Sequence, residues 1–170
     1  GAVDRMETLI DDLLMLARRG ETIGETEPVP IAAVAEEAWG SVRAPDATLT
    51  IADEIGRVEA DPGRLRQALE NLFRNAVDHG GPEVSIEVGP LTADGGVGGM
   101  YVADDGPGIP VELADTVFDS GVSSADSSGI GLAIVDRIVE AHEWDIEARN
   151  DDGAVFELTF GADATRVAAP

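Results

Sequence analysis

The sequence contains neither cysteine nor lysine among its 170 residues. The absence of cysteine excludes a disulfide framework, an iron–sulfur cluster and a thiolate zinc site. The absence of lysine leaves 11 arginines as the only permanently charged basic residues, against 34 acidic residues, and the formal net charge is −23. This balance argues against nucleic-acid binding, which needs clustered positive charge, and against contact with an anionic membrane.

The chain also lacks any apolar run close to the roughly 20 residues that span a bilayer, and it has no signal-peptide pattern. We therefore expect a cytoplasmic segment, whether or not the full-length protein is membrane-anchored. The length suits one domain with an appendage, and 44% hydrophobic residues suffice for a core. Because the sequence starts inside an amphipathic helical pattern, we expect it to be a piece of a longer protein.

The excess of acidic side chains indicates adaptation to salt. Carboxylate repulsion on this scale strains a fold in dilute salt, and dissolved ions screen it. We therefore predict a protein from a cell with high internal salt, with an ordinary acidic protein as the alternative.

The first residues show a strong amphipathic pattern. Apolar residues recur at helical spacing over 3–19, with acidic residues and arginines on the other face: Met6, Leu9, Ile10, Leu13, Leu14, Leu16 and Ala17. A stripe of this strength at a terminus indicates a partner helix. Residues 20–30 lack the pattern and indicate a linker. We assign 1–19 to this helix, 20–27 to the linker, 28–161 to the main domain and 162–170 to a C-terminal tail.

Predicted helices and strands interleave in the main domain. Helices are expected at 31–42, 62–78 and 130–141. Strands are expected at 48–52 and 57–60 around a turn at Gly56, at 84–88 and 99–103 joined by the glycine-rich residues 92–99, and at 145–149 and 154–160. Because several strands are joined by short turns, we predict a two-layer α/β sandwich. Its single mixed, mostly antiparallel sheet would carry helices on one face.

The helix at 62–78 has clear boundaries and two separate stripes. Asp61 is suited to the N-cap and Pro62 to the first turn, and Gly80-Gly81-Pro82 ends the helix. Leu65, Leu69, Leu72 and Ala76 fall on one face, and Asn71, Asn75 and Asp78 fall on another. Asparagine is a poor helix former, so two of them one turn apart need a reason. An amide oxygen is a hard, neutral ligand for Mg²⁺; two surface asparagines are the alternative.

Two glycine-containing motifs follow. In Asp104-Asp-Gly-Pro-Gly108-Ile109, the carboxylate at the end of a strand can accept a hydrogen bond from an exocyclic amine such as that of adenine. In Ser128-Gly-Ile-Gly-Leu-Ala133, glycines flank a helix start, where free amides favour phosphate. An Asp-Gly turn and a plain loop-to-helix junction are the alternatives. The polar residues 119–129 predict a mobile loop, the natural lid, which offers no basic side chain.

In this order and spacing the motifs, with Phe118 between the last two, resemble the N, G1, F and G2 boxes of the sensor histidine kinase ATP-binding domain. That domain belongs to a superfamily (GHKL, with a Bergerat-type fold) shared with gyrase B, a mismatch-repair ATPase and a heat-shock chaperone. The resemblance covers about residues 28–161. Residues 4–17 resemble the second helix of the kinases' dimerisation hairpin. Together with its charge, the chain resembles an enzyme from a halophilic archaeon.

The resemblance implies ATP and Mg²⁺ as ligands and a role for each matching residue. Asn75 corresponds to the Mg²⁺ ligand, Asn71 to its companion, Asp104 to the adenine-reading carboxylate and Phe118 to the F-box anchor. The other implied ATP-site residues are Asp78, His79, Gly106, Gly108, Ile109, Gly129, Ile130, Gly131 and Leu132. Three of the positions depart from the family pattern. Many members have Lys at Asp78, Tyr at His79 and Gly at Ser127, which leaves Arg74, Mg²⁺ and bulk cations to neutralise the phosphates.

The resemblance further implies a protein histidine kinase that transfers the ATP γ-phosphate to a histidine outside this chain. His142 lies where the family commonly closes a helix, and His79 lies at the pocket mouth, so neither is expected to be the acceptor. A homodimer through the N-terminal helix and a response regulator are the implied partners. A superfamily ATPase would need a water-activating Glu where this chain has Asn71. A nucleotide-binding regulatory module without kinase activity is the other alternative, favoured by Asp78 and the lid without basic residues.

Overall fold

The structure, a computed structural model, describes residues 10, 25–53, 55–93, 96–108 and 131–161. The helices within these residues are α2 (Ile31–Gly40), α3 (Pro62–Gly80) and α4 (Gly131–Ala141). The strands are β1 (Glu27–Pro30), β2 (Thr48–Ile51), β3 (Arg57–Ala60), β4 (Ser85–Ala93), β5 (Gly96–Asp104), β6 (Asp145–Asn150) and β7 (Ala154–Thr159). None of the helices in this part of the chain is long and apolar enough to cross a membrane.

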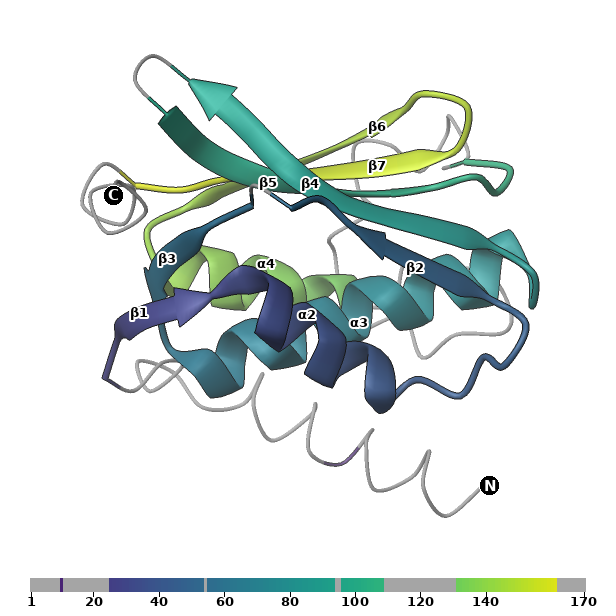
Figure 1. The fold of residues 1–170 in the computed structure, drawn as a ribbon, viewed down its shortest axis with the longest axis horizontal. Helices are drawn as coiled ribbons and strands as arrows, with labels where there is room; N and C mark the ends of the chain where they lie inside the picture. The colour runs from purple at the N-terminus through teal and green to yellow at the C-terminus, as the bar shows by residue number, and fades with distance from the viewer. Residues whose placement is uncertain (1–9, 11–24, 54, 94–95, 109–130, 162–170) are drawn as a thin grey trace.

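The main sheet has five strands in the order β2-β4-β5-β7-β6. β2 pairs with β4 in parallel, and the other neighbours pair antiparallel. The three helices lie together on one face of this sheet, which gives two layers (Figure 1). The predicted two-layer sandwich with a mixed, mostly antiparallel sheet is therefore confirmed.

The expectation of a single sheet was wrong. β1 and β3 form a separate two-stranded antiparallel sheet, in which Val29 lies opposite Val58. Residues 27–30, expected to be linker, thus form a strand, because their backbone finds a partner far along the chain. The two short strands beside Gly56 do not pair with each other, since β2 joins the main sheet and β3 joins β1.

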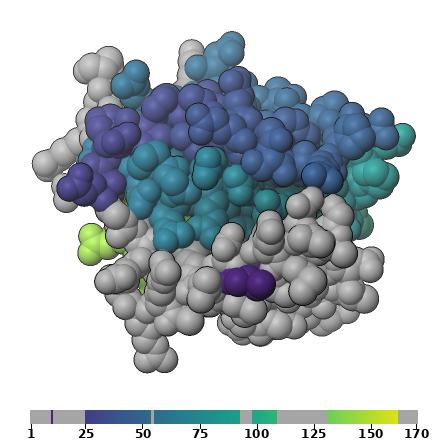
Figure 2. Space-filling model, turned by 90° about the horizontal axis from the view of Figure 1, so that it is seen from below, coloured from purple at the N-terminus to yellow at the C-terminus, as the bar shows by residue number. Residues whose placement is uncertain are grey.

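Helix α3 begins at Pro62, as the sequence predicts, and ends at Gly80, two residues beyond the predicted end and within the predicted glycine stop. The side chain of Asp61 accepts hydrogen bonds from the amides of Gly63 (3.0 Å) and Arg64 (3.3 Å), which the first helical turn would otherwise leave unpaired. Gly81 ends the helix with a φ of 99°, a backbone conformation that favours glycine. The helix packs beside α2, and the two form adjoining bands of the surface when seen from the helix side (Figure 2).

The core lies between the sheet and the three helices. Along α3, the apolar stripe Leu65, Leu69 and Leu72 is at most 1% exposed, and so is Phe73. These side chains meet the inward residues of β4, β5 and β7, including Ile86, Met100 and Leu158. Full burial of one such side chain stabilises the fold by about 1.5–3 kcal/mol. The apolar stripe therefore fixes which face of α3 meets the sheet. The stripe that carries Asn71 and Asn75 consequently lies on a different face of the helix.

Other boundaries differ modestly from expectation. β4 and β5 extend to Ala93 and from Gly96, because backbone pairing continues through the glycine-rich segment that was expected to be a connection. Helix α2 ends at Gly40 rather than at residue 42. The predicted lid at 119–129 lies outside the described residues. Of the predicted N-terminal helix only Ile10 is described; it is helical and 53% exposed.

Candidate nucleotide site

Asp104 lies at the end of the central strand β5, with its side chain half-buried. Its Oδ1 atom accepts hydrogen bonds from the backbone amides of Gly106 (2.9 Å) and Ala154 (3.3 Å). Both bonds end on Oδ1, so Oδ2 is the oxygen left to accept from a ligand. The carboxylate is thus oriented by backbone amides from the segment after β5 and from the start of β7 before any ligand arrives.

Burial raises the pKa of Asp104 above the ordinary value of an aspartate. The two backbone amides and the nearby His79 oppose this shift, and the neighbouring Asp105 adds to it. A desolvated carboxylate is a strong hydrogen-bond acceptor for an amine, because little water competes for it. A raised pKa is also typical of carboxylates at functional sites.

The backbone packs unusually closely around this carboxylate. A Cβ on Gly106 would lie 2.6 Å from the Cα of Gly80, the last residue of α3. A Cβ on Gly153, in the β6–β7 turn, would overlap the backbone oxygen of Asp104. Glycine at these positions brings the end of α3, the segment after β5 and the β6–β7 turn to one point.

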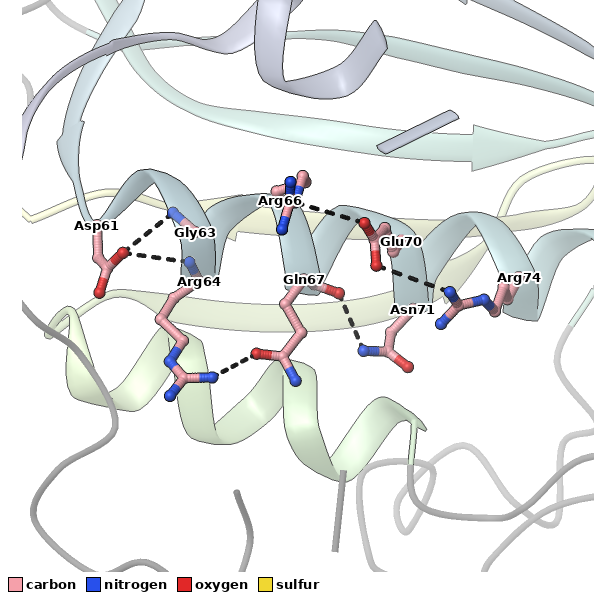
Figure 3. A network of polar contacts seen from close by, with 8 residues as sticks. All are labelled: Asp61, Gly63, Arg64, Arg66, Gln67, Glu70, Asn71 and Arg74. Atoms are coloured by element: carbon pink, nitrogen blue, oxygen red, sulfur yellow. Dashed lines mark hydrogen bonds and ion pairs between the residues drawn. The ribbon is translucent and has the colours of Figure 1, made fainter. Parts of the chain in front are cut away.

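Asn71 lies on the side of α3 that faces the start of α4 (Figure 3). It is 6% exposed, and its amide nitrogen donates to the backbone oxygen of Gln67 at 2.9 Å. A Cβ on Gly131, the first residue of α4, would lie 3.2 Å from the Asn71 Oδ1. The predicted N and G2 motifs therefore meet in space. Asn75 is half-buried one turn further along, and Asp78 is exposed.

Glu70 points to another side of α3 (Figure 3). It pairs with Arg66 (3.5 Å) and with Arg74 (3.7 Å), each one helical turn away. Glu70 is therefore not positioned beside Asn71. Arg74, a candidate for neutralising phosphate charge, is held by an acidic neighbour on its own helix.

Several other predicted site residues can be placed, and others cannot. Gly108 turns with a φ of 87°, and a Cβ there would lie 2.7 Å from the Oδ1 of Asn150. Leu132 is half-buried and packs against the core. Ile109, Phe118, Gly129 and Ile130 lie outside the described residues.

Sequence reasoning missed Gly80, Gly153 and Ala154 as parts of this site. Gly80 was interpreted only as a helix stop, and Ala154 only as the first residue of a strand. The Asp-Asp-Gly sequence at 151–153 marks a tight turn, but nothing in it indicates that the turn reaches Asp104. That contact depends on β7 lying beside β5, which is a property of the sheet order.

The donor set fits a Mg²⁺ ion that keeps most of its water and phosphate ligands. The described residues contain no cluster of three His, Asp or Glu side chains that could enclose a metal. Asn75 instead offers one neutral amide oxygen on a half-buried helix face. Mg²⁺ is commonly bound through one or two protein oxygens together with nucleotide phosphates.

The profile of the histidine kinase-, DNA gyrase B- and HSP90-like ATPase family matches residues 60–164. The sensor histidine kinase ZraS of Klebsiella oxytoca is 34% identical over 164 residues, which cover 92% of this chain and 35% of that protein. The chain thus spans about a third of that relative's length.

Two solved structures share the fold. Full-length ShkA in complex with AMPPNP has a TM-score of 0.72 and 28% identity, over 91% of this chain and 35% of that one. A nucleotide-free catalytic domain of the histidine kinase ThkA has a TM-score of 0.67 and 25% identity, over 81% of this chain and 95% of that one.

The chain therefore belongs to the histidine kinase-, DNA gyrase B- and HSP90-like ATPase family. Within that family its relatives are sensor histidine kinases, and this chain carries their ATP-binding catalytic domain.

Proposed function

We propose that this chain binds ATP with Mg²⁺ at the site formed by α3, α4 and the end of β5. Asp104 reads the adenine amine through Oδ2, and Asn75 contributes an oxygen to Mg²⁺. The first turn of α4 receives phosphate beside Asn71. The observation that carries the proposal is the Asp104 carboxylate, half-buried at a strand end and held on Oδ1 by two backbone amides. Binding of a ligand amine would account for a carboxylate that is partly withdrawn from water at this position.

The proposed site extends over Asp78, His79, Gly106, Gly108, Ile109, Phe118, Gly129, Ile130, Gly131 and Leu132. His79 lies close enough for its charge to lower the pKa of Asp104, which supports its place beside the base. When bound, Mg²⁺ neutralises phosphate charge and orients the phosphates. The residues of this chain bind the base, orient the nucleotide and receive the phosphates on backbone amides.

The reaction proposed for the whole protein is transfer of the ATP γ-phosphate to a histidine that precedes this segment. Catalysis would consist mainly of positioning and charge neutralisation, as is usual for phosphoryl transfer. The test is to extend the chain by the preceding helix and supply MgATP. Acid-labile phosphate on that helix's histidine is the expected product. Binding without any phosphotransfer would instead support a regulatory nucleotide module, which the exposed Asp78 favours.

Hydrolysis of ATP by this site is disfavoured by Glu70. An ATPase of the superfamily activates water with a glutamate one turn before the Mg²⁺-binding asparagine, and this chain has Asn71 there. Glu70 is paired with Arg66 and Arg74 on another side of the helix (Figure 3).

The setting of the whole protein forms part of the proposal. Residues 1–19 are the second helix of a dimerisation hairpin, 20–27 a linker, 28–161 the catalytic domain and 162–170 a tail. The protein dimerises through the first of these segments and passes phosphate to a response regulator. It works in the cytoplasm, where ATP is supplied. The charge of −23 supports an origin in a halophilic archaeon.

A further inference from the structure

Helices α3 and α4 touch at two specialised points, one at each end of α4. At its first residue, Gly131 lies against the side chain of Asn71. Just beyond its last residue, His142 reaches the N-cap residue of α3, Asp61. Eleven helical residues separate these points, a span of about 16 Å at 1.5 Å per residue. Because α4 is a rigid helix, a contact that fixes its C-terminal end also constrains the position of its first turn.

His142 is held through both ring nitrogens. Its Nε2 accepts a hydrogen bond from the backbone amide of Asp61 at 3.1 Å. Its Nδ1 lies 2.7 Å from the carbonyl oxygen of Ile138, one turn back in α4. An amide can only donate and a carbonyl can only accept, so the pair of contacts selects the neutral tautomer with the proton on Nδ1.

The ring of His142 is also stacked. Its centroid lies 4.5 Å from that of Trp144, with 29° between the planes, and Trp144 lies 4.8 Å from Phe160. Trp144 is 5% exposed, so the imidazole rests on a buried platform that continues into the core. The end of α4 is therefore fixed to both the sheet and α3.

We propose that His142 is a positioning residue for the nucleotide site. By fastening the end of α4 to the N-cap of α3, it holds the phosphate-receiving first turn of α4 against Asn71. The inference rests on the proposed nucleotide site, to which Gly131 and Asn71 belong. His142 itself touches neither nucleotide nor metal in this scheme.

The hydrogen bond between His142 and the Asp61 amide is sensitive to acid. Protonation places a second proton on Nε2, which then faces the Asp61 N–H as donor against donor. Burial lowers the pKa of His142; the Ile138 carbonyl and the Asp61 carboxylate oppose this shift. The other acids close by in the chain are Glu140 in the last turn of α4, Glu143 in the turn after it and Asp145 at the start of β6, and all three are exposed. The His142 ring therefore stays neutral, and keeps its hydrogen bond to the Asp61 amide, until the pH falls below the ordinary pKa of histidine, about 6.5.

Two substitutions separate the hydrogen bond from the packing. His142→Phe keeps a ring on Trp144 and loses the acceptor, whereas His142→Gln keeps an acceptor at the position of Nε2 and cannot titrate. We expect His142→Phe to weaken ATP binding by about fivefold at neutral pH, and His142→Gln to bind within about twofold of the original chain. The measurement is calorimetry on the 170-residue chain with Mg²⁺ at fixed salt, with the melting temperature followed in parallel.

The pH dependence of ATP affinity is a second measurement, and a residue with a merely structural role would not change it. Between about pH 7.5 and 5.5, the original chain should lose affinity faster than His142→Gln. The titrations of Asp104 and of the ATP phosphates are common to both proteins and cancel in the ratio of the affinities. If the ATP affinity of the original chain divided by that of His142→Gln stays constant over this pH range, the inference is overturned, even if His142→Phe fails to fold.

A nucleotide-free measurement separates this inference from the proposed function. His142→Phe should shift the amide resonances of Gly131 and the side-chain amide of Asn71, at the far end of α4. If the original chain binds no ATP, the proposed function fails. The resonances of Gly131 and Asn71 then show by themselves whether His142 positions α4. Unchanged resonances, or unchanged ATP affinity in a folded His142→Phe protein, would show that His142 does not position α4.

Discussion

The amide oxygen of Asn71 lies against the backbone of Gly131, so closely that a Cβ on residue 131 would come within 3.2 Å of it. The contact joins a helix in the middle of the chain to one sixty residues later. It also places the N-terminal end of α4 beside the face of α3 that carries Asn71 and Asn75. The consequences for binding can be measured residue by residue.

Substituting Gly131→Ala should weaken ATP binding by about tenfold while changing the melting temperature little. Alanine is the better helix former by about 1 kcal/mol, which offsets much of the crowding against Asn71. The added methyl group also occupies the helix start where phosphate is received. Calorimetry and thermal melts on the same preparation distinguish the two effects. Unchanged affinity would mean that the start of α4 does not receive phosphate.

Asp104→Asn should weaken ATP binding at least tenfold, equivalent to about 1.4 kcal/mol, because an amide oxygen is a poorer acceptor than a carboxylate. The fold should survive, since the asparagine oxygen can still accept from Gly106 and Ala154. GTP should bind the original chain poorly, because it presents a carbonyl where adenine presents an amine. Affinity equal to that of the original chain, with native circular dichroism, would refute the assignment.

The same substitution should change the pH dependence of stability. The pKa of Asp104 is raised in the folded state, so between the unfolded and folded pKa values the folded chain binds more protons. The stability contribution of this group therefore falls as the pH rises through that window and stays lost at neutral pH. Asp104→Asn removes this loss, and its melting temperature should equal or exceed that of the original chain at pH 7.

Asn75→Ala should impair nucleotide binding mainly when Mg²⁺ is present. The side chain lies one turn beyond Asn71 on the same stripe and offers a neutral oxygen to the metal. The measurement compares ATP affinity with Mg²⁺ against ADP affinity in a chelator. Gln67→Ala, about two helical turns before Asn75 on α3 and outside the proposed site, is the control. Equal losses with and without the metal would show that Asn75 is not a ligand.

Raising the salt concentration should raise the melting temperature steeply. With 34 acidic residues against 11 arginines, repulsion acts over a Debye length of about 30 Å at 0.01 M salt and about 3 Å at 1 M. A series in KCl, compared with sucrose at equal osmolality, separates charge screening from general exclusion effects. A melting temperature that is flat across the KCl series would contradict adaptation to salt.

Deleting residues 1–19 should abolish self-association and preserve ATP binding. The predicted helix carries a wide apolar stripe, and exposed patches of that size are rare on soluble monomers. No site residue lies within the deleted segment. Sedimentation analysis and calorimetry on the shortened chain test both parts. Persistent dimers, or a loss of ATP binding, would place the boundary between the dimerisation and catalytic segments elsewhere.

The sequence by itself determined most of the helices and strands, and it indicated the chemistry that we propose for the site. Helix α3 could be predicted at both ends because its signals are local: a capping Asp61, a proline, and the glycines that stop it. The separation of Asn71 from Leu69 and Leu72 is equally local, because helical periodicity alone sets it.

Only the tertiary structure decided what those elements touch. β1 could not be predicted because its partner β3 lies some thirty residues away, and no local pattern specifies such pairing. The contributions of Ala154 and Gly153 to the setting of Asp104 depend on β7 lying beside β5. The bond from Asp61 to His142 joins residues 81 positions apart, brought together by the antiparallel packing of two helices. Local sequence fixes periodicity and capping, whereas burial of a shared core selects which distant backbones meet.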